Sequence, residues 1–248
     1  FTPYDYDRTS DKETIYGVAG ISVWNYYGLP TNSRQSSAGI SPTQELIDSY
    51  ETADGHPILK KTEDGKYYKD DSHLQPNFNE AAGYDDQNPY ENRDPRFYQS
   101  VYFNGAQRHW DDPDELVKIY DNAPRDSSCA IDKTTIRNTR TGYYMRKYDK
   151  HTSSYETPVT GYVRRFRLAE LYLNFAEAAN EAYGPTQQVE GYSGQASMSA
   201  VEAVNAVRTR ADMPNVRDEY TTDRDVFRDR IWNERRVEFA FEPLRFYD

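Results

Sequence analysis

The chain has 248 residues and a formal net charge of −11, because 41 Asp and Glu outnumber 30 Lys and Arg. This acidic balance argues against nucleic acid as a partner, since phosphates need a basic surface, and against attachment to anionic lipid through charge alone. No stretch approaches the roughly 20 apolar residues of a membrane helix. The length suffices to bury a sizeable core in one domain or two.

Tyrosine supplies much of the apolar surface of this chain. Hydrophobic residues make up only 36% of the sequence, yet 23 residues are Tyr. Many side chains must therefore bury a ring while keeping a hydroxyl near water or a partner. Such rings suit sugar binding, in which a ring face packs on the C–H face of a pyranose, and they equally suit a polar core. The single Cys129 offers no intrachain disulfide and no metal cluster, and we expect no cofactor.

The N-terminal part, residues 1–41, is predicted to be a loop-and-strand region with a dense aromatic group. A helix is predicted next, with Ser41 as its cap, Pro42 at the first helical position and Gln44 at the third. Its apolar positions lead to Asp54-Gly55, where we expect it to end.

Residues 56–90 are hydrophilic and are predicted to be exposed, irregular chain. An alternating strand is predicted to follow, through Phe97, Ser100 and Tyr102. The next loop holds Trp110 in an acidic setting, and residues 141–148 predict a short strand.

Three amphipathic helices are predicted in the last eighty-odd residues. Gly184-Pro185 ends the first, because Gly accepts the left-handed geometry and Pro cannot continue a helix. Ser199 and Glu202 form a capping box that starts the second, which should end at Met213-Pro214. The third opens near Thr222 and Asp225. The apolar stripe of the first helix is expected to comprise Leu168, Leu171, Tyr172, Phe175, Ala179 and Ala182.

Two carboxylates fall on the apolar stripe of the third helix, because Glu234 and Glu238 share the spacing of Phe227, Ile231 and Phe241. Retaining glycosidases hold two catalytic carboxylates roughly 5–5.5 Å apart, but normally from separate elements across a cleft. We favour a structural role, in which arginines keep both groups ionised and join the helices. The residues predicted to form these ion pairs are Arg167, Glu170, Glu234, Arg235 and Glu238, with Arg208, Arg210 and Arg236 nearby.

Six motifs in this order resemble the SusD/RagB family. They are ISPTQELIDSYETADG (40–55), NPYENRDPRFYQSVYFNG (88–105), TGYYMRKY, FRLAELYLNFAEAANEA, AVEAVNAVRTRA and ERRVEFAFEPLRFYD. Family members commonly carry Gly before the final motif, where this chain has Pro243. The connection 184–198 is also longer than the tight turn of the tetratricopeptide-like units on which the family is built.

The resemblance implies a mainly α fold, a tetratricopeptide-like helical scaffold with extensive loops and a few short strands. We expect a loop-rich region over 1–160 and a helical region over 161–248, together forming the C-terminal portion of a longer protein whose N-terminal part and extreme C-terminus are absent. The implied function is non-catalytic glycan binding at the cell surface of Bacteroidetes. The implied partner is a SusC-like TonB-dependent transporter in the outer membrane, with membrane contact only through a lipid anchor outside this chain.

Several family members bind sugar through an aromatic platform shortly before the first motif. In this sequence that position holds Trp24, Tyr26 and Tyr27, with Asn25 and Asn32 as candidate partners of sugar hydroxyls. Trp24 could equally be a core residue beneath the loop. Trp110 is the second candidate, whereas Trp232 lies within a helix and is predicted to pack.

Two other classes of function remain open at this point. A glycoside hydrolase or its accessory domain shares the acidic, Tyr-rich composition, but would need carboxylates facing each other across a cleft, and no motif provides them. A helical-repeat adaptor for protein partners would lack an exposed aromatic platform.

Overall fold

A computed structural model of the chain describes residues 11–21, 40–107, 116–120, 139–147, 161–191 and 196–247. The chain divides into two compact units, each assembled from separate stretches of sequence. The first unit comprises Phe1–Gln44, Phe97–Arg167 and Phe241–Leu244, and the second comprises Glu45–Arg96, Leu168–Ala240 and Arg245–Asp248.

The first unit contains two short antiparallel ribbons. Strand β1 (Thr14–Ile21) pairs with β4 (Gly161–Arg167), and β2 (Val101–Tyr102) pairs with β3 (Tyr144–Met145), which confirms the strand predicted within 141–148. The small core beside the second ribbon consists of Tyr102, Ala106, Val117, Ile119 and Tyr144, with Phe103 packed against it. Two of its five buried residues are tyrosines, so tyrosine rings supply part of the buried apolar surface that aliphatic side chains would otherwise provide.

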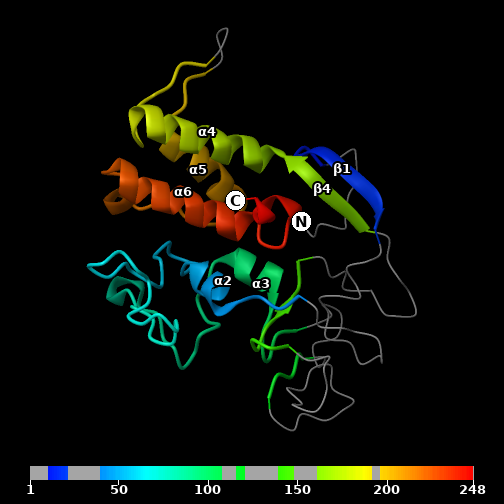
Figure 1. Cartoon of the computed structure of the whole chain (residues 1–248). Coiled ribbons are helices and arrows are strands. Elements are labelled where there is room, and N and C mark those ends of the chain that lie inside the picture. The colour runs from blue at the N-terminus through cyan, green and yellow to red at the C-terminus, as the bar shows by residue number, and fades with distance from the viewer. Residues whose placement is uncertain are drawn as a thin grey trace. The chain divides into compact units, whose positions relative to one another are not determined.

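The second unit contains the three predicted helices, α4 (Leu168–Tyr183), α5 (Ala200–Arg210) and α6 (Arg224–Glu238). Helix α4 packs against both α5 and α6 (Figure 1). The predicted capping box of α5 is present, with Glu202 N–H donating to Ser199 Oγ and Ser199 N–H donating to the Glu202 carboxylate. Asp223 caps α6, close to the predicted start. The mainly α fold is therefore as predicted.

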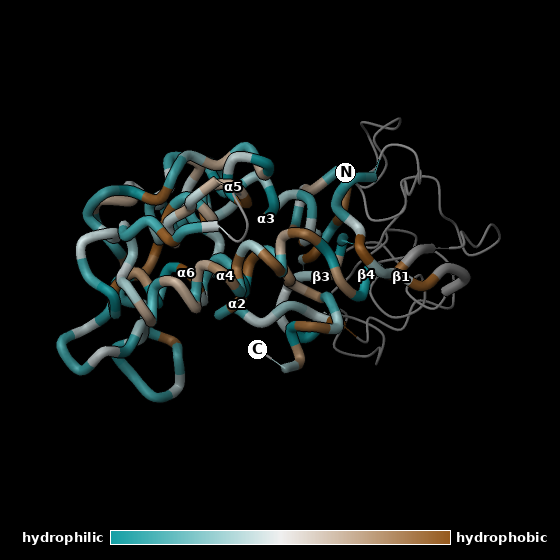
Figure 2. Tube along the Cα trace, turned by 90° about the horizontal axis from the view of Figure 1, so that it is seen from above, coloured by the Kyte–Doolittle hydropathy of each residue, from teal (hydrophilic) through white to brown (hydrophobic). Residues whose placement is uncertain are grey.

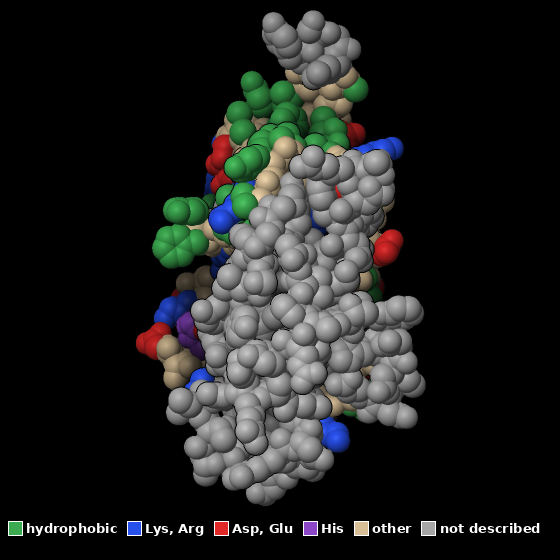
Figure 3. Space-filling view, turned by 90° about the vertical axis from the view of Figure 1, so that its right-hand side faces the viewer, with side chains coloured by type: hydrophobic (Ala, Val, Ile, Leu, Met, Phe, Trp, Pro, Cys, Tyr) green, Lys and Arg blue, Asp and Glu red, His purple; other side chains and the backbone are tan. Residues whose placement is uncertain are grey.

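The predicted apolar stripe of α4 is buried only in part: Ala179 is buried and Tyr172 and Phe175 are half-buried, whereas Leu168, Leu171 and Ala182 are exposed. The buried face is formed by Ala169, Leu173, Ala176, Ala179 and Asn180. Three of these five buried residues are alanines, so the largest apolar side chains do not define the buried face. Leu168 and Leu171 are instead exposed, and hydrophobic side chains are visible in the upper part of Figure 3, the level at which α4 lies in Figure 1.

Two helix ends differ from the prediction. Helix α5 ends at Arg210, before Met213-Pro214, and α6 ends at Glu238, so Phe241 is not part of its stripe. Phe239 closes α6, its N–H donating to the carbonyls of Arg235 and Val237. Phe241 has a φ of 65°, a left-handed value that a continuing helix cannot contain. It packs with Met145 in the first unit.

The helix predicted from Ser41 is much shorter than expected. Helix α2 spans only Gln44–Ser49, so Ser41 is not its cap and it stops before Asp54-Gly55. The buried guanidinium of Arg93 donates to the carbonyls of Ile47 and Tyr50, at 2.6 and 3.0 Å. These carbonyls are the acceptors that further helical turns would need, so a distant arginine ends the helix.

The strand predicted through Phe97 and Ser100 is a helix, α3 (Pro95–Ser100), followed by the two residues of β2. Asp94 accepts the N–H of Arg96 at 2.8 Å, the bond of an N-cap, and Pro95 stands at the first helical position. The Asp-Pro start signal therefore prevails over the alternating pattern.

Residues 56–90 are irregular, as predicted, but not simply exposed. Ile58, Leu59 and Tyr68 form a buried cluster, with Tyr67, Phe78 and Tyr84 packed against it. Figure 2 shows short apolar runs scattered through a largely hydrophilic chain. The cluster brings together apolar residues from separate parts of the 56–90 segment. Within the described ranges, no helix combines the length and apolar character needed to cross a membrane.

Candidate functional site

The residues predicted to bind sugar lie outside the part of the chain that the structure describes. They are Trp24, Asn25, Tyr26, Tyr27, Asn32 and Trp110. Their predicted role therefore stays a prediction. Two other arrangements of functional groups are described, and both involve α6.

The first arrangement is a cluster around the carboxylates of α6, formed by Asp94, Arg96, Arg208, Arg210, Glu234 and Glu238, which we call the carboxylate cluster. Arg96 Nη1 donates to Glu234 at 2.5 Å and to Glu238 at 3.0 Å. Arg208 Nη1 donates to the second oxygen of Glu234 at 3.0 Å, and Arg210 donates to the second oxygen of Glu238. All four carboxylate oxygens of this pair thus accept an arginine N–H.

The carboxylates of the cluster keep two of its arginines charged. Burial disfavours the charged form of Arg96, but the carboxylates of Glu234, Asp94 and Glu238 outweigh it and raise the Arg96 pKa well above its ordinary value. Burial likewise opposes the charge of Arg208, while Glu51 and Glu234 raise its pKa overall. A general acid needs surroundings that favour its protonated form. Each oxygen of Glu234 and Glu238 is instead occupied by an arginine N–H.

The other residues predicted to join this network have different surroundings. Arg235 donates to Asn174 Oδ1 at 2.6 Å, and its guanidinium lies over the ring of Phe239. Glu170 is half-buried in the first turn of α4. Trp232, predicted to pack, is 51% exposed, although its indole N–H donates to Glu177 of α4 at 2.9 Å.

Arg167 forms ion pairs within the first unit. It contacts Glu13 at 2.6 Å and Glu242 at 2.9 Å, and Lys147 also pairs with Glu242 at 2.7 Å. Burial favours the neutral form of Glu242, but Lys147 and Arg167 outweigh it, so the Glu242 pKa lies below its ordinary value. These contacts join β4 to residues that follow α6 in sequence.

Sequence reasoning did not select Arg96 as a member of the carboxylate cluster. Asp94 orients its guanidinium through contacts at 2.7–3.2 Å, and Arg96 then bridges Glu234 and Glu238 from 138 and 142 residues away. The available signal was Arg-Asp-Pro-Arg in an otherwise acidic stretch, where two arginines surround a helix start.

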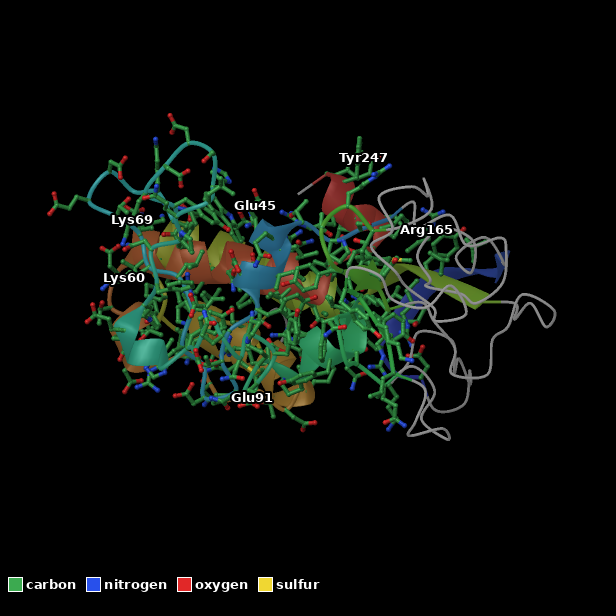
Figure 4. The ribbon with its side chains drawn as sticks, turned by 90° about the horizontal axis from the view of Figure 1, so that it is seen from below. Glu45, Lys60, Lys69, Glu91, Arg165 and Tyr247 are labelled. Atoms are coloured by element: carbon green, nitrogen blue, oxygen red, sulfur yellow. The ribbon has the colours of Figure 1, made fainter. Side chains whose placement is uncertain are left out.

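The second arrangement is a cavity of about 460 Å³ in the second unit, bounded by α2, residues 57–73 and α6; we call it the α2–α6 pocket. This volume lies in the range typical of small-molecule sites. Figure 4 shows Glu45 on α2, with Lys60 and Lys69 on the adjoining irregular segment. The polar and aromatic residues that line it include Glu45, Asp48, Tyr67, Tyr68, His73, Asn233 and Arg236.

Fixed contacts hold one wall of the pocket. The hydroxyl of Tyr68 donates to Asp48 at 2.6 Å, and the ring of His73 stacks on Tyr68 with centroids 4.5 Å apart and planes within 3°. The Nδ1 atom of His73 lies 2.9 Å from Glu45 Oε1. Burial and the Asp48 carboxylate raise the pKa of Tyr68 far above its ordinary value, so its hydroxyl stays a donor.

The backbone at His73 has a φ of 57°, a left-handed conformation uncommon for residues other than glycine. This turn brings the imidazole back over Tyr68. Among the described residues, no group of three or more His, Cys, Asp or Glu side chains could hold a metal ion. The pocket is therefore lined for hydrogen bonding and ring contact.

Comparison with known proteins gives the family. The sequence model of the SusD family matches residues 1–248, and the chain belongs to that family. This confirms the resemblance that the six motifs indicate. No curated protein sequence matches the chain significantly.

Solved structures of the same fold come from Bacteroides. A SusD-like protein from Bacteroides fragilis is 27% identical with a TM-score of 0.60, over 99% of this chain and 44% of that one. A SusD-like carbohydrate-binding protein from Bacteroides fragilis is 28% identical with a TM-score of 0.62, over 97% and 42%. A SusD superfamily protein from Bacteroides vulgatus shares the fold at 15% identity and a TM-score of 0.54, over 99% and 41%. The chain thus spans less than half the length of these proteins.

Proposed function

We propose that this chain is part of a non-catalytic, cell-surface glycan-binding protein that delivers oligo- or polysaccharide to a SusC-like TonB-dependent transporter in the outer membrane. The observation that carries the proposal is the family match over 1–248, joined with the structural likeness to a SusD-like carbohydrate-binding protein. In this proposal a lipid anchor provides the attachment to the membrane. Co-purification of a TonB-dependent transporter with the membrane-extracted protein tests the partnership, and its consistent absence argues against delivery.

The surroundings of Glu234 and Glu238 support the proposed absence of hydrolysis. Every oxygen of the two carboxylates accepts an arginine N–H, so neither group is placed across a cleft from the other as a catalytic pair would be. Incubation with a bound polysaccharide should release no reducing ends above a blank. Turnover that disappears in Glu234→Gln or Glu238→Gln would show that the pair is catalytic after all.

The primary sugar site in this proposal is the aromatic segment Trp24, Tyr26 and Tyr27, with Asn25 and Asn32 as hydroxyl partners. Adjacent aromatic residues cannot all point inward, so we expect at least one ring to be exposed, which suits stacking on a pyranose. Truncation of an anchor residue at a binding hot spot costs roughly 2 kcal/mol or more. Calorimetry with Trp24→Ala and Tyr26→Ala should show at least tenfold weaker binding in folded protein. Unchanged affinity in both variants would move the site to the loop of Trp110.

A further inference from the structure

The α2–α6 pocket presents several polar groups that other parts of the protein do not use. Arg236 makes one long hydrogen bond, 3.4 Å to Ser49 Oγ, and no ion pair with any described residue. Asn233 donates to the carbonyl of Ser49 at 3.0 Å, while its own amide oxygen accepts nothing from the described residues. The guanidinium of Arg236 and the amide oxygen of Asn233, both lining residues, therefore retain unused hydrogen-bonding capacity.

The opposite wall adds two more unused groups beside aromatic surface. The hydroxyl of Tyr67 and the Nε2 atom of His73 have no hydrogen-bond partner in the described part of the chain. The Tyr67 ring is half-buried, with the Lys61 ammonium 5.8 Å from its centroid. His73 is held parallel to Tyr68. The stacked His73 and Tyr68 rings thus form a preorganised wall beside Tyr67.

The charges of the lining set the class of ligand. Carboxylates are contributed by Glu45, Asp48, Asp70 and Asp71, and cations by Lys66, Arg230 and Arg236. Lys66 and Asp71 already pair at 2.9 Å, and His73 and Tyr68 bond to Glu45 and Asp48. Four carboxylates against three cations give the lining a net charge of −1, so neither an anion nor a cation gains strong attraction. An uncharged ligand with many hydroxyl groups fits both the spare donors and the spare acceptors.

We infer that the α2–α6 pocket is a second saccharide site, which takes one neutral sugar unit of a bound glycan. Arg236 donates to sugar hydroxyls, Asn233 accepts from them, and the ring of Tyr67 packs on the sugar's C–H face. This inference rests on the proposed function, since it assigns a further contact to the same class of ligand. It is independent of where the primary site lies, because none of its residues belongs to the segments around Trp24 or Trp110.

The test uses the whole protein of which this chain is part, together with defined probes. Calorimetry is run with maltohexaose, cellohexaose, xylohexaose and mannohexaose as neutral probes, and with hexagalacturonate as the acidic one. The variants are Arg236→Gln, Asn233→Ala, Tyr67→Phe and Tyr67→Leu. Arg217→Gln is the matched control, because Arg217 lies in the same unit, is exposed and pairs only with nearby Glu219.

We expect Arg236→Gln and Asn233→Ala each to weaken binding of a neutral hexasaccharide about five- to tenfold, the usual loss for a hydrogen bond to a charged or polar group. Tyr67→Leu should weaken binding more than Tyr67→Phe, which keeps the ring, and Arg217→Gln should match the wild type. Affinity unchanged in all the pocket variants overturns the second site and leaves the proposed function intact. If hexagalacturonate alone binds and its binding depends on Arg236, the assignment of a neutral sugar as ligand is overturned. If the wild type binds no probe, the proposed function and the pocket assignment are both overturned.

Discussion

Helix α6 borders two regions that use the same types of side chain in opposite ways. In the carboxylate cluster, both oxygens of Glu234 and of Glu238 accept arginine N–H groups, and the two side chains are only 2% and 3% exposed. In the α2–α6 pocket, Arg236 and Asn233 retain unused hydrogen-bonding capacity beside a cavity. The polar groups of the cluster hydrogen-bond to each other, whereas those of the pocket keep donors and acceptors that a ligand can use.

Burial explains why the two regions should respond differently to mutation. Removing one partner of a buried ion pair leaves an uncompensated charge, which is far more costly than removing a group that water can replace. The carboxylate cluster should therefore govern stability, and the pocket should govern binding. Stability measurements on both regions can sharpen this contrast or break it.

The largest effect is expected for Glu234→Gln. Glu234 takes one N–H from Arg96 and one from Arg208, so its neutralisation leaves two buried arginines short of a counter-charge. We expect a loss of about 3–5 kcal/mol in the free energy of unfolding. Chemical denaturation measures it, with the exposed Glu219→Gln as the matched control. Equal stability of Glu234→Gln and the control would show that the cluster does not hold the helices.

A smaller loss is expected for Glu238→Gln. Its partner Arg210 is 42% exposed and can be hydrated, while Arg96 keeps Asp94 and Glu234 as partners. We expect about 1–3 kcal/mol, between the values for exposed and buried pairs. Thermal melts of the two variants side by side give the ranking. A greater loss in Glu238→Gln than in Glu234→Gln would reverse the order that burial predicts.

An acid-dependent effect is expected in the first unit, at Asp11. Burial would raise the pKa of Asp11, but hydrogen bonds from Thr14 and Glu13 and the nearby Arg164 outweigh it and lower the pKa to about 2. Because the folded pKa is depressed, the stabilisation is present above about pH 4 and is lost as the pH falls toward 2. Its full size is up to about 2 kcal/mol.

The measurement for Asp11 is stability as a function of pH. Asp11→Asn should be less stable than the wild type at neutral pH, and the difference should shrink between pH 4 and pH 2. A constant difference over this range would mean that the charge of Asp11 contributes nothing and that only its hydrogen bonds matter.

The smallest effect on stability is expected for Arg236→Gln. Its guanidinium makes a single long hydrogen bond to Ser49 within the described chain, so water can replace that contact. We expect a change within about 0.5 kcal/mol. A thermal melt tests this directly. A loss comparable to that of Glu234→Gln would assign Arg236 to the scaffold and remove the contrast between the two sides of α6.

The parts of this fold that were predictable from sequence rest on local interactions. The Ser199–Glu202 capping box and the stop at Gly184 involve residues within one turn of each other, and both occur where predicted. The six motifs were enough to indicate the family. The local pattern also placed Glu234 and Glu238 on an inward face of α6, where both are buried. The predicted sugar-binding residues, by contrast, fall outside the described chain.

The sequence by itself determined the three long helices, the capping box of α5 and the stop of α4 at Gly184, because each depends on neighbours within a few residues. Its six ordered motifs also indicated the family. Only the tertiary structure decided where α2 ends, since Arg93, more than 40 residues away in sequence, donates to the carbonyls of Ile47 and Tyr50 at the end of the helix. It likewise decided that alanines form the buried face of α4, and that Arg96 completes the carboxylate cluster. The α2–α6 pocket belongs to the same class of feature. Its walls come from segments more than 150 residues apart, and hydrogen bonds made elsewhere determine which polar groups remain unused.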